Sequence, residues 1–221
     1  ARWIHLLGPV EVELDAEAAR RVEASSAVVR AWENSDDVVY GVTTGFGDLA
    51  TVNISRKDRR LLQENLLKSH ACGVGEPFSE EITRAMMLLR INSLIRGFSG
   101  ISLSTLKQYV AFLNLGITPV VPSKGSVGAS GDLCPLSHLA LPLLGHGKVR
   151  YKGRVMMAAK ALQAAGLQPV QLGAKEGIAL NNGTASMGAM GVIAIMAAED
   201  LAKTADIAAA LSIEALHGVP Y

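Results

Sequence analysis

The sequence predicts a mainly α-helical fold, in which a central bundle of long helices is joined to a smaller, loop-rich N-terminal region. Of the 221 residues, 49% are hydrophobic, only 5% are aromatic, and alanine is frequent. Runs of β-branched residues are short, and apolar residues recur at helical spacing. This apolar share is enough for a sizeable core and excludes a disordered chain, a collagen or a small disulfide scaffold.

Charge and cysteine content narrow the choice of partners and compartment. The 21 Lys and Arg residues and the 20 Asp and Glu residues leave a net charge of +1. With no broad basic field, we expect neither a nucleic acid nor a membrane as partner. Cys72 and Cys134 lack the spacing of metal ligands, and the N-terminus lacks a signal-peptide pattern. We therefore expect a cytoplasmic protein without a bound metal.

The first third of the chain is predicted to alternate between helices and loops. In order, the elements are a strand at 10–14, a helix at 16–32 and a glycine-broken loop at 38–47. Ser55 with Asp58 three residues later resembles a capping box, which predicts a helix that starts there and runs to Ser69. Glycines at 73 and 75 then end that helix.

The middle of the chain is predicted to continue with short helices and one hairpin. Ser79 can cap a helix that runs to Arg96, and Gly97 supplies its end. The later elements are a helix at 104–115, a small-residue loop at 123–134, a helix at 136–144 and a hairpin at 148–156.

A long helix is predicted from Gly183 to about Leu216, roughly 50 Å in length. Its first half is apolar nearly all round, so we expect neighbouring helices to surround it, some from other subunits or from chain beyond residue 221. The apolar run at 185–198 is shorter than the roughly 20 residues that cross a bilayer. Residues 1–221 are thus expected to form a single unit, the N-terminal part of a longer protein.

The segment Gly125-Ser-Val-Gly-Ala-Ser-Gly-Asp-Leu133 is the most informative one in the sequence. Its composition suits either a phosphate-binding nest or a plain turn between two helices. It contains neither a Gly-Lys-Ser/Thr ending nor a Gly-x-Gly-x-x-Gly spacing, so the phosphate templates do not fit. The plain turn remains open on composition alone.

Together with Lys124, this segment resembles the self-processing loop of the aromatic amino acid ammonia-lyase and aminomutase family. In that family an Ala-Ser-Gly triplet cyclises with the loss of two waters, giving 4-methylidene-imidazol-5-one (MIO). The resemblance implies that Ala129-Ser130-Gly131 form this electrophilic cofactor, and that Asp132 assists the dehydration. Glycine suits the attacking position because a Cβ there would hinder ring closure.

Three further segments, at 40–47, 88–100 and 175–184, match the family in the same order. The resemblance implies that Tyr40 lies on a mobile loop over the electrophile and takes part in proton handling. It implies that Asn182 hydrogen-bonds near the cofactor or the substrate amine. The alternative for Tyr40 is a structural loop aromatic.

Substrate choice in the family is associated with the position of Ser69-His70. Members that act on histidine carry Ser-His there, whereas tyrosine-specific members carry His-Leu and phenylalanine-specific members carry Phe-Leu. The resemblance thus implies elimination of ammonia from L-histidine to give trans-urocanate. The polar pair Ser69-His70 can hydrogen-bond an imidazole ring, whereas a phenyl ring would leave these groups without hydrogen bonds and would bind less well. The alternative for His70 is a core histidine with its hydrogen bonds satisfied.

Two alternative functions remain open beside this one. Action on phenylalanine or tyrosine, or aminomutase activity, is the nearer alternative, and a non-enzymatic helical assembly protein is the second. Thr43, Asn181 and Ala185 depart from residues common in histidine-acting members. His138 and His146 lie eight residues apart without a third ligand, so we interpret them as structural.

The resemblance also implies a homotetramer whose active sites are each built from three subunits. Members of the family are more than twice as long as this chain. Further family residues, among them a tyrosine, an arginine and a glutamate, would lie beyond Tyr221. We therefore expect residues 1–221 alone to turn over no histidine.

Overall fold

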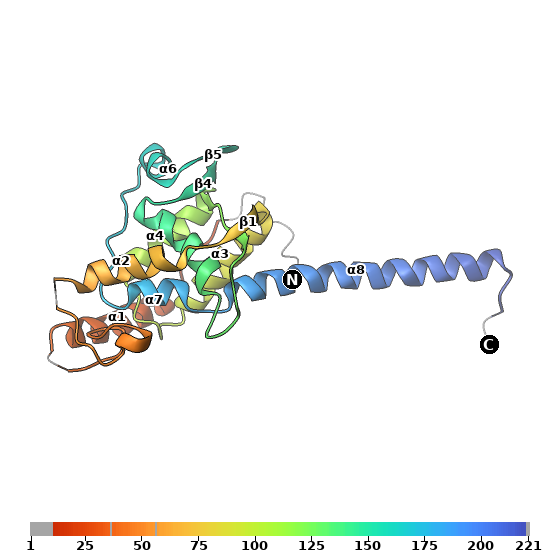
Figure 1. Cartoon of the computed structure of the whole chain (residues 1–221). Coiled ribbons are helices and arrows are strands. Elements are labelled where there is room, and N and C mark those ends of the chain that lie inside the picture. The colour runs from red at the N-terminus through yellow and green to blue at the C-terminus, as the bar shows by residue number, and fades with distance from the viewer. Residues whose placement is uncertain (1–10, 36, 56, 220–221) are drawn as a thin grey trace.

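A computed structural model describes residues 11–35, 37–55 and 57–219. Short helices and two small sheets form a packed body, and the last helix extends from it as a long rod (Figure 1). The prediction of a mainly α fold is confirmed. The prediction that residues 1–221 form one unit of a longer protein stays a prediction.

The first helix, α1 (Ala16–Glu33), begins where the sequence predicts it. The Asp15 carboxylate accepts a hydrogen bond from the Ala18 amide and caps the helix. The predicted strand at 10–14 is wrong for residues 11–14, and residue 10 lies outside the described residues. Val12 instead exchanges two hydrogen bonds of 2.9 Å with the Asn114 side chain, so an amide group replaces a strand partner.

The second helix, α2 (Arg59–His70), begins later than predicted. The Ser55 hydroxyl donates to the Asp58 carboxylate at 2.5 Å, but these residues form the turn before the helix rather than its capping box. A short 3-10 helix, η2 (Gly47–Leu49), lies in the preceding loop. The helix start predicted at Ser55 is therefore wrong, although the two side chains contact each other.

The core lies between α3 (Glu80–Leu94), α4 (Leu103–Asn114) and α5 (Leu133–Ala140). Ser79 caps α3 as predicted, with the Ile82 amide donating to its hydroxyl at 3.2 Å. Arg96 follows the end of α3. Gly97 then has a φ of +79°, the left-handed backbone conformation in which many helices end and which glycine adopts without strain. The largest fully buried side chains include Met86, Met87, Leu94, Tyr109, Phe112, Leu136 and Leu139.

Two small antiparallel sheets complete the body. In one, β1 (Val74–Pro77) pairs with β3 (Pro122–Lys124). In the other, β2 (Thr118–Pro119) pairs with β4 (Lys148–Tyr151), which pairs with β5 (Arg154–Met157). The last pair is the predicted hairpin, and its turn residues Lys152 and Gly153 both have positive φ. A 3-10 helix η3 (Leu141–Leu144) and α6 (Ala158–Ala165) flank this hairpin.

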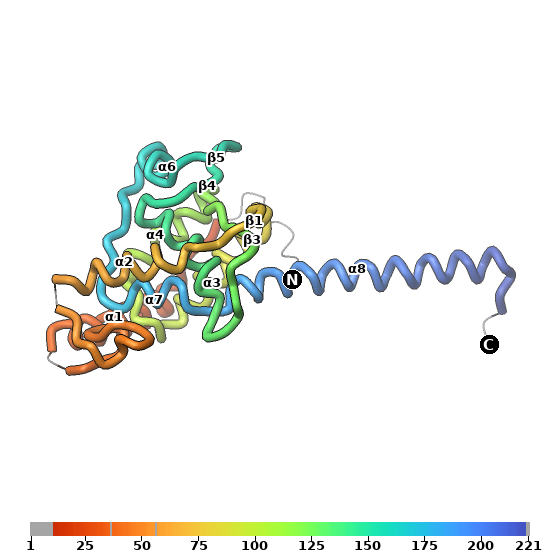
Figure 2. The backbone as a smooth tube through the Cα atoms, in the orientation of Figure 1, coloured from red at the N-terminus to blue at the C-terminus, as the bar shows by residue number. Residues whose placement is uncertain are grey.

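The C-terminal part contains α7 (Glu176–Asn181) and the 31-residue α8 (Ala185–Ala215), which Figure 2 shows as consecutive segments. The start of α8 packs on α3, and its buried residues are Ala185, Ser186 and Ala189. Apolar side chains farther along are exposed, including Ile195, Leu201, Ile207 and Leu211. The neighbours expected around the first half of the helix are therefore mostly not supplied by the described residues.

The apolar run at 185–198 lies within a longer, mostly helical span. By length and composition alone, the span Glu176–Ala215 could cross a membrane. Core helices of soluble proteins meet the same criterion of length and composition.

Candidate active site

The small-residue loop at 125–132 connects β3 to α5 at the surface of the body. Residues 123–130 are exposed, whereas Gly131 and Asp132 are buried. Ser130 has a φ of +61°, in the left-handed region that non-glycine residues rarely adopt. The loop thus presents its serine to solvent in a strained backbone conformation and is anchored at its C-terminal end.

Gly131 lies against the turn between α7 and α8. A Cβ built on this glycine would come within 2.7 Å of Asn182 Oδ1 and 2.8 Å of the Gly183 amide nitrogen. Gly131 also has a φ of +137°. Only glycine fits this close approach of the backbone, and the structure places Asn182 beside the triplet.

Asp132 anchors the end of the loop and is fully buried. Its Oδ1 accepts a hydrogen bond from the Ser126 hydroxyl at 2.8 Å, and its Oδ2 accepts one from the Met187 amide at 2.9 Å. Its own amide donates to the Gly183 carbonyl at 2.7 Å. The carboxylate therefore connects the loop to the first turn of α8, where the helix dipole favours a negative charge.

Asn181, noted in the sequence only as a departure, holds the α7 end in place. Its side chain is fully buried, and its Nδ2 donates to the Ser137 hydroxyl on α5 at 3.1 Å. Its Oδ1 has no hydrogen-bond partner among the described residues. The Asn181 amide group therefore connects the end of α7 to α5 within the buried interior, at the position before Asn182.

Arg90 is a second residue whose importance the sequence pattern did not reveal. Its guanidinium is buried and donates to the Ala179 carbonyl of α7. It also fills the space beside the Gly183 Cα, where a Cβ would collide with it. Burial lowers the pKa of Arg90, and nearby Tyr109 opposes that shift. A single charged residue within the otherwise apolar run 86–91 of α3 is the signal that could have singled it out.

Ser69 and His70 lie at the C-terminal end of α2, Ser69 exposed and His70 half-buried. The Ser69 hydroxyl donates to the Leu66 carbonyl at 3.0 Å. His70 Nδ1 lies 2.8 Å from the same carbonyl and 3.1 Å from the Ser69 hydroxyl. Because a carbonyl only accepts, Nδ1 is the protonated nitrogen, and Nε2 of the neutral ring remains an acceptor.

Tyr40 lies in a separate loop and is 54% exposed. Its ring packs edge-on against Phe46, with centroids 6.0 Å apart. The loop is held by its own hydroxyl groups, because Thr43 Oγ1 donates to the Asp37 carbonyl at 2.7 Å and accepts from the Val39 amide at 2.8 Å. In the described ranges, no hydrogen bond or ring contact joins Tyr40 to residues 125–132, so the structure does not bring these two predicted site elements into contact.

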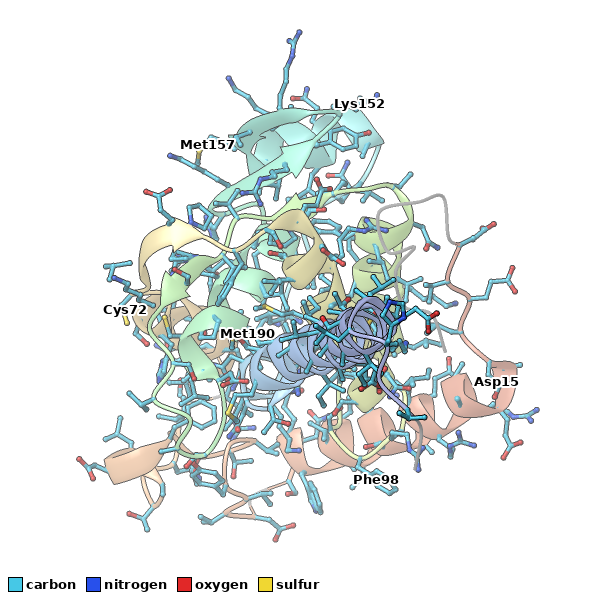
Figure 3. The ribbon with its side chains drawn as sticks, turned by 90° about the vertical axis from the view of Figure 1, so that its right-hand side faces the viewer. Asp15, Cys72, Phe98, Lys152, Met157 and Met190 are labelled. Atoms are coloured by element: carbon cyan, nitrogen blue, oxygen red, sulfur yellow. The ribbon has the colours of Figure 1, made fainter. Side chains whose placement is uncertain are left out.

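An open groove of about 500 Å³ runs between residues 122–128 and the first turns of α8. Phe78, Met187 and Met190 give it apolar walls. Asp132 and Ser186 add polar groups to its lining, and the Ser186 hydroxyl is buried without a hydrogen-bond partner among the described residues. Met190 lies near the base of the rod in Figure 3.

The two histidines interpreted as structural have separate partners. His138 Nε2 accepts a hydrogen bond from the Gly73 amide at 3.0 Å, and burial lowers the pKa of His138. His146 Nε2 lies 3.0 Å from Glu64, whose carboxylate also pairs with Lys68. In the part of the chain that the structure describes, no group of three His, Cys, Asp or Glu residues is placed to hold a metal ion.

Comparisons with known proteins show which family this chain resembles. Residues 2–221 match the profile of a family described as aromatic amino acid lyase. The histidine ammonia-lyase of Geobacillus thermodenitrificans is 54% identical over 218 residues, which are 99% of this chain and 43% of that protein. That of Symbiobacterium thermophilum is 52% identical over 95% of this chain and 41% of the relative. The chain thus spans about two fifths of the length of these relatives.

Solved structures show the same fold. Phenylalanine aminomutase of Pantoea agglomerans superposes with a TM-score of 0.92 at 38% identity, over 98% of this chain and 42% of that one. Histidine ammonia-lyase of Trypanosoma cruzi gives a TM-score of 0.91 at 39% identity, with the same coverage.

Proposed function

This chain belongs to the aromatic amino acid lyase family, and from that premise we propose that the full-length protein is a histidine ammonia-lyase. It would eliminate ammonia from L-histidine and release trans-urocanate. The observation that carries this proposal is the packing of Gly131 against Asn182 and Gly183, beside Ser130 with its strained backbone. This site has no room for a Cβ at position 131.

The residues of the loop fit a cofactor made from the chain itself. Ring closure requires the Gly131 nitrogen to reach the Ala129 carbonyl carbon, and the missing Cβ and the positive φ of Gly131 support that bend. Two waters leave, one from the ring closure and one from the Ser130 side chain. The product, MIO, supplies an electrophile that no ordinary side chain provides.

Asp132 is proposed to assist the dehydration. Its carboxylate accepts from the Ser126 hydroxyl on one side and from the first turn of α8 on the other. It is thereby fixed one residue after Gly131, in a buried site where a hydrogen bond to a charged group is strong. Loss of this anchor would free the C-terminal end of the triplet.

Ser69, His70, Asn182 and Tyr40 are proposed to act on the substrate. His70 Nε2 is an acceptor that suits the N–H group of an imidazole ring, and Ser69 orients His70. Asn182, against Gly131, would bind near the substrate amine. Tyr40 would exchange a proton through its exposed phenol oxygen once its loop covers the site.

The full-length protein is proposed to be a homotetramer in the cytoplasm, with each active site shared between subunits. The long row of exposed apolar side chains on α8 supports burial by other chain segments, because soluble proteins rarely leave such a surface in water. Lys203 pairs with Asp200 at 3.6 Å on the same helix, and such ionised groups favour this soluble assembly over a membrane span.

Intact mass and product absorbance test the proposal on the full-length protein. We expect a mass two waters below the translated sequence, and the Ser130→Ala variant should keep both waters and lose activity. Purified enzyme should form urocanate from L-histidine in preference to products from L-phenylalanine or L-tyrosine. A preference for tyrosine would favour the sister enzymes, and an unchanged mass without turnover would favour a helical assembly protein.

A further inference from the structure

The two cysteines of the chain, 62 positions apart in sequence, meet at the base of the loop that carries the triplet. Cys72 is exposed two residues after the end of α2, where Figure 3 shows it at the edge of the body, and Cys134 is buried in the first turn of α5. Both are free thiols. Neither has a part in the proposed function.

The contact between the two segments is tight. A Cβ built on Gly73, the residue after Cys72, would lie 3.2 Å from Cys134 Sγ and 3.1 Å from His138 Nε2. Cys134 and His138 are one helical turn apart, so they share the face of α5 that meets Gly73. The hydrogen bond from the Gly73 amide to His138 Nε2 holds that contact at 3.0 Å.

Strand pairing fixes the same place from the other side. Val74 pairs with Lys124, and the adjacent Gly125 approaches Cys134 so closely that a Cβ there would collide with its sulfur. Cys134 Sγ is therefore enclosed between Gly73 and Gly125, next to Cys72. Burial is the main cause that raises the pKa of the Cys134 thiol. The Cys72 thiol raises this pKa further, and a hydrogen bond with the Cys72 backbone lowers it.

We propose that Cys72 and Cys134 form a reversible disulfide, which makes this point a redox modification site. The exposed Cys72 thiolate attacks one sulfur of a low-molecular-weight disulfide such as oxidised glutathione and displaces one thiol. Cys134 then gives up its proton and attacks, as the thiolate, the Cys72 sulfur of the mixed disulfide; the second small thiol leaves as a thiolate and takes up that proton. Two protein thiols are oxidised to one disulfide, and the small disulfide is reduced to two thiols.

The bond would connect the end of α2, which carries Ser69 and His70, to the start of α5, which follows Asp132. A disulfide that closes a long chain segment restricts the unfolded ensemble. The oxidised protein should therefore unfold at a higher temperature than the reduced protein. Because the bond is read by mass and by unfolding, the test is independent of the proposed lyase activity.

The experiment uses the full-length protein equilibrated with oxidised glutathione, trapped with N-ethylmaleimide and digested without reduction. We expect a cross-linked pair of peptides that contain residues 72 and 134, two hydrogens lighter than their sum, which disappears on reduction. The Cys72→Ser variant should lack this pair and should lose the rise in the unfolding midpoint. This exposed position tolerates serine, so the test does not depend on a substitution in the core.

The Cys134→Ala variant is the matched control, because it should hold Cys72 as a mixed disulfide with glutathione. If wild-type Cys72 also stops at the mixed disulfide while Cys134 is alkylated only after denaturation, the proposal is wrong. Equal unfolding midpoints for the oxidised and reduced protein would likewise contradict the constraint that the bond is expected to impose.

Discussion

The packed body and the distal part of α8 use the same kind of apolar residues in opposite ways. In the body, Leu136 and Leu139 are fully buried among helices of the same chain. On α8, Leu211 is 67% exposed although the helix is equally apolar. The difference teaches that the described residues bury the apolar core of the body, whereas they leave most of the apolar surface of α8 uncovered.

The largest expected effect concerns the loop in the body. Gly131→Ala should abolish both the two-water mass loss and histidine turnover of the full-length protein, because its Cβ would come within 2.7 Å of Asn182 Oδ1. Gly128→Ala is the matched control: it also has positive φ, but its Cβ would make an ordinary 3.8 Å contact with Met187. The control should cost about 1–2 kcal/mol of stability and retain maturation. Normal maturation of Gly131→Ala would contradict the packing argument.

A pair of leucine substitutions compares the two regions directly. In the chain of residues 1–221, Leu139→Ala should lower the free energy of unfolding by about 2–5 kcal/mol, because it leaves a cavity in the core. Leu211→Ala should change it by less than about 0.5 kcal/mol, because the side chain is exposed. Denaturant unfolding measures both. In the full-length protein the Leu211→Ala cost should rise, and an unchanged cost there would contradict burial of α8 by other segments.

Substitution of Arg90 measures how much its contact with α7 contributes to the free energy of unfolding. Arg90→Met should lower the free energy of unfolding by about 1–3 kcal/mol, because the buried Ala179 carbonyl loses its donor. Arg20→Met on the exposed face of α1 is the control and should stay within about 0.5 kcal/mol. Thermal unfolding compares the two variants, and equal effects would show that the buried hydrogen bond contributes little.

The smallest expected effect is a pH dependence at His138. Its neutral ring accepts from Gly73, and burial holds the pKa of His138 below the ordinary value of 6.5. As the pH falls below about 6.5, the unfolded chain takes up the proton first, so the free energy of unfolding should decrease. His138→Gln keeps an acceptor that does not titrate and should reduce this decrease between about pH 7.5 and about pH 5. His217→Gln, at an exposed position, is the control. If the free energy of unfolding of both variants depends on pH in the same way, groups other than His138 cause the decrease.

Much of the local structure could be predicted from the sequence. Ser79 as a cap, the turn at Lys152-Gly153 and the helix 16–32 depend on residues within a few positions of one another. The resemblance of residues 129–132 to the family motif depends only on their order along the chain. The Ser55–Asp58 pair shows the limit, because a serine followed three residues later by an acid can lie in the turn before a helix as well as at its first turn.

What the sequence alone determined is the residue chemistry of the loop and the helical character of the chain. Only the tertiary structure decided that Val12 binds Asn114, that Arg90 binds α7, and that Gly131 lies against Asn182. Such contacts join positions from about 50 to more than 100 residues apart, and no local pattern specifies which distant groups pair. Their pairing follows from close packing of whole helices, in which each buried polar group must find a partner and each close approach must find a glycine.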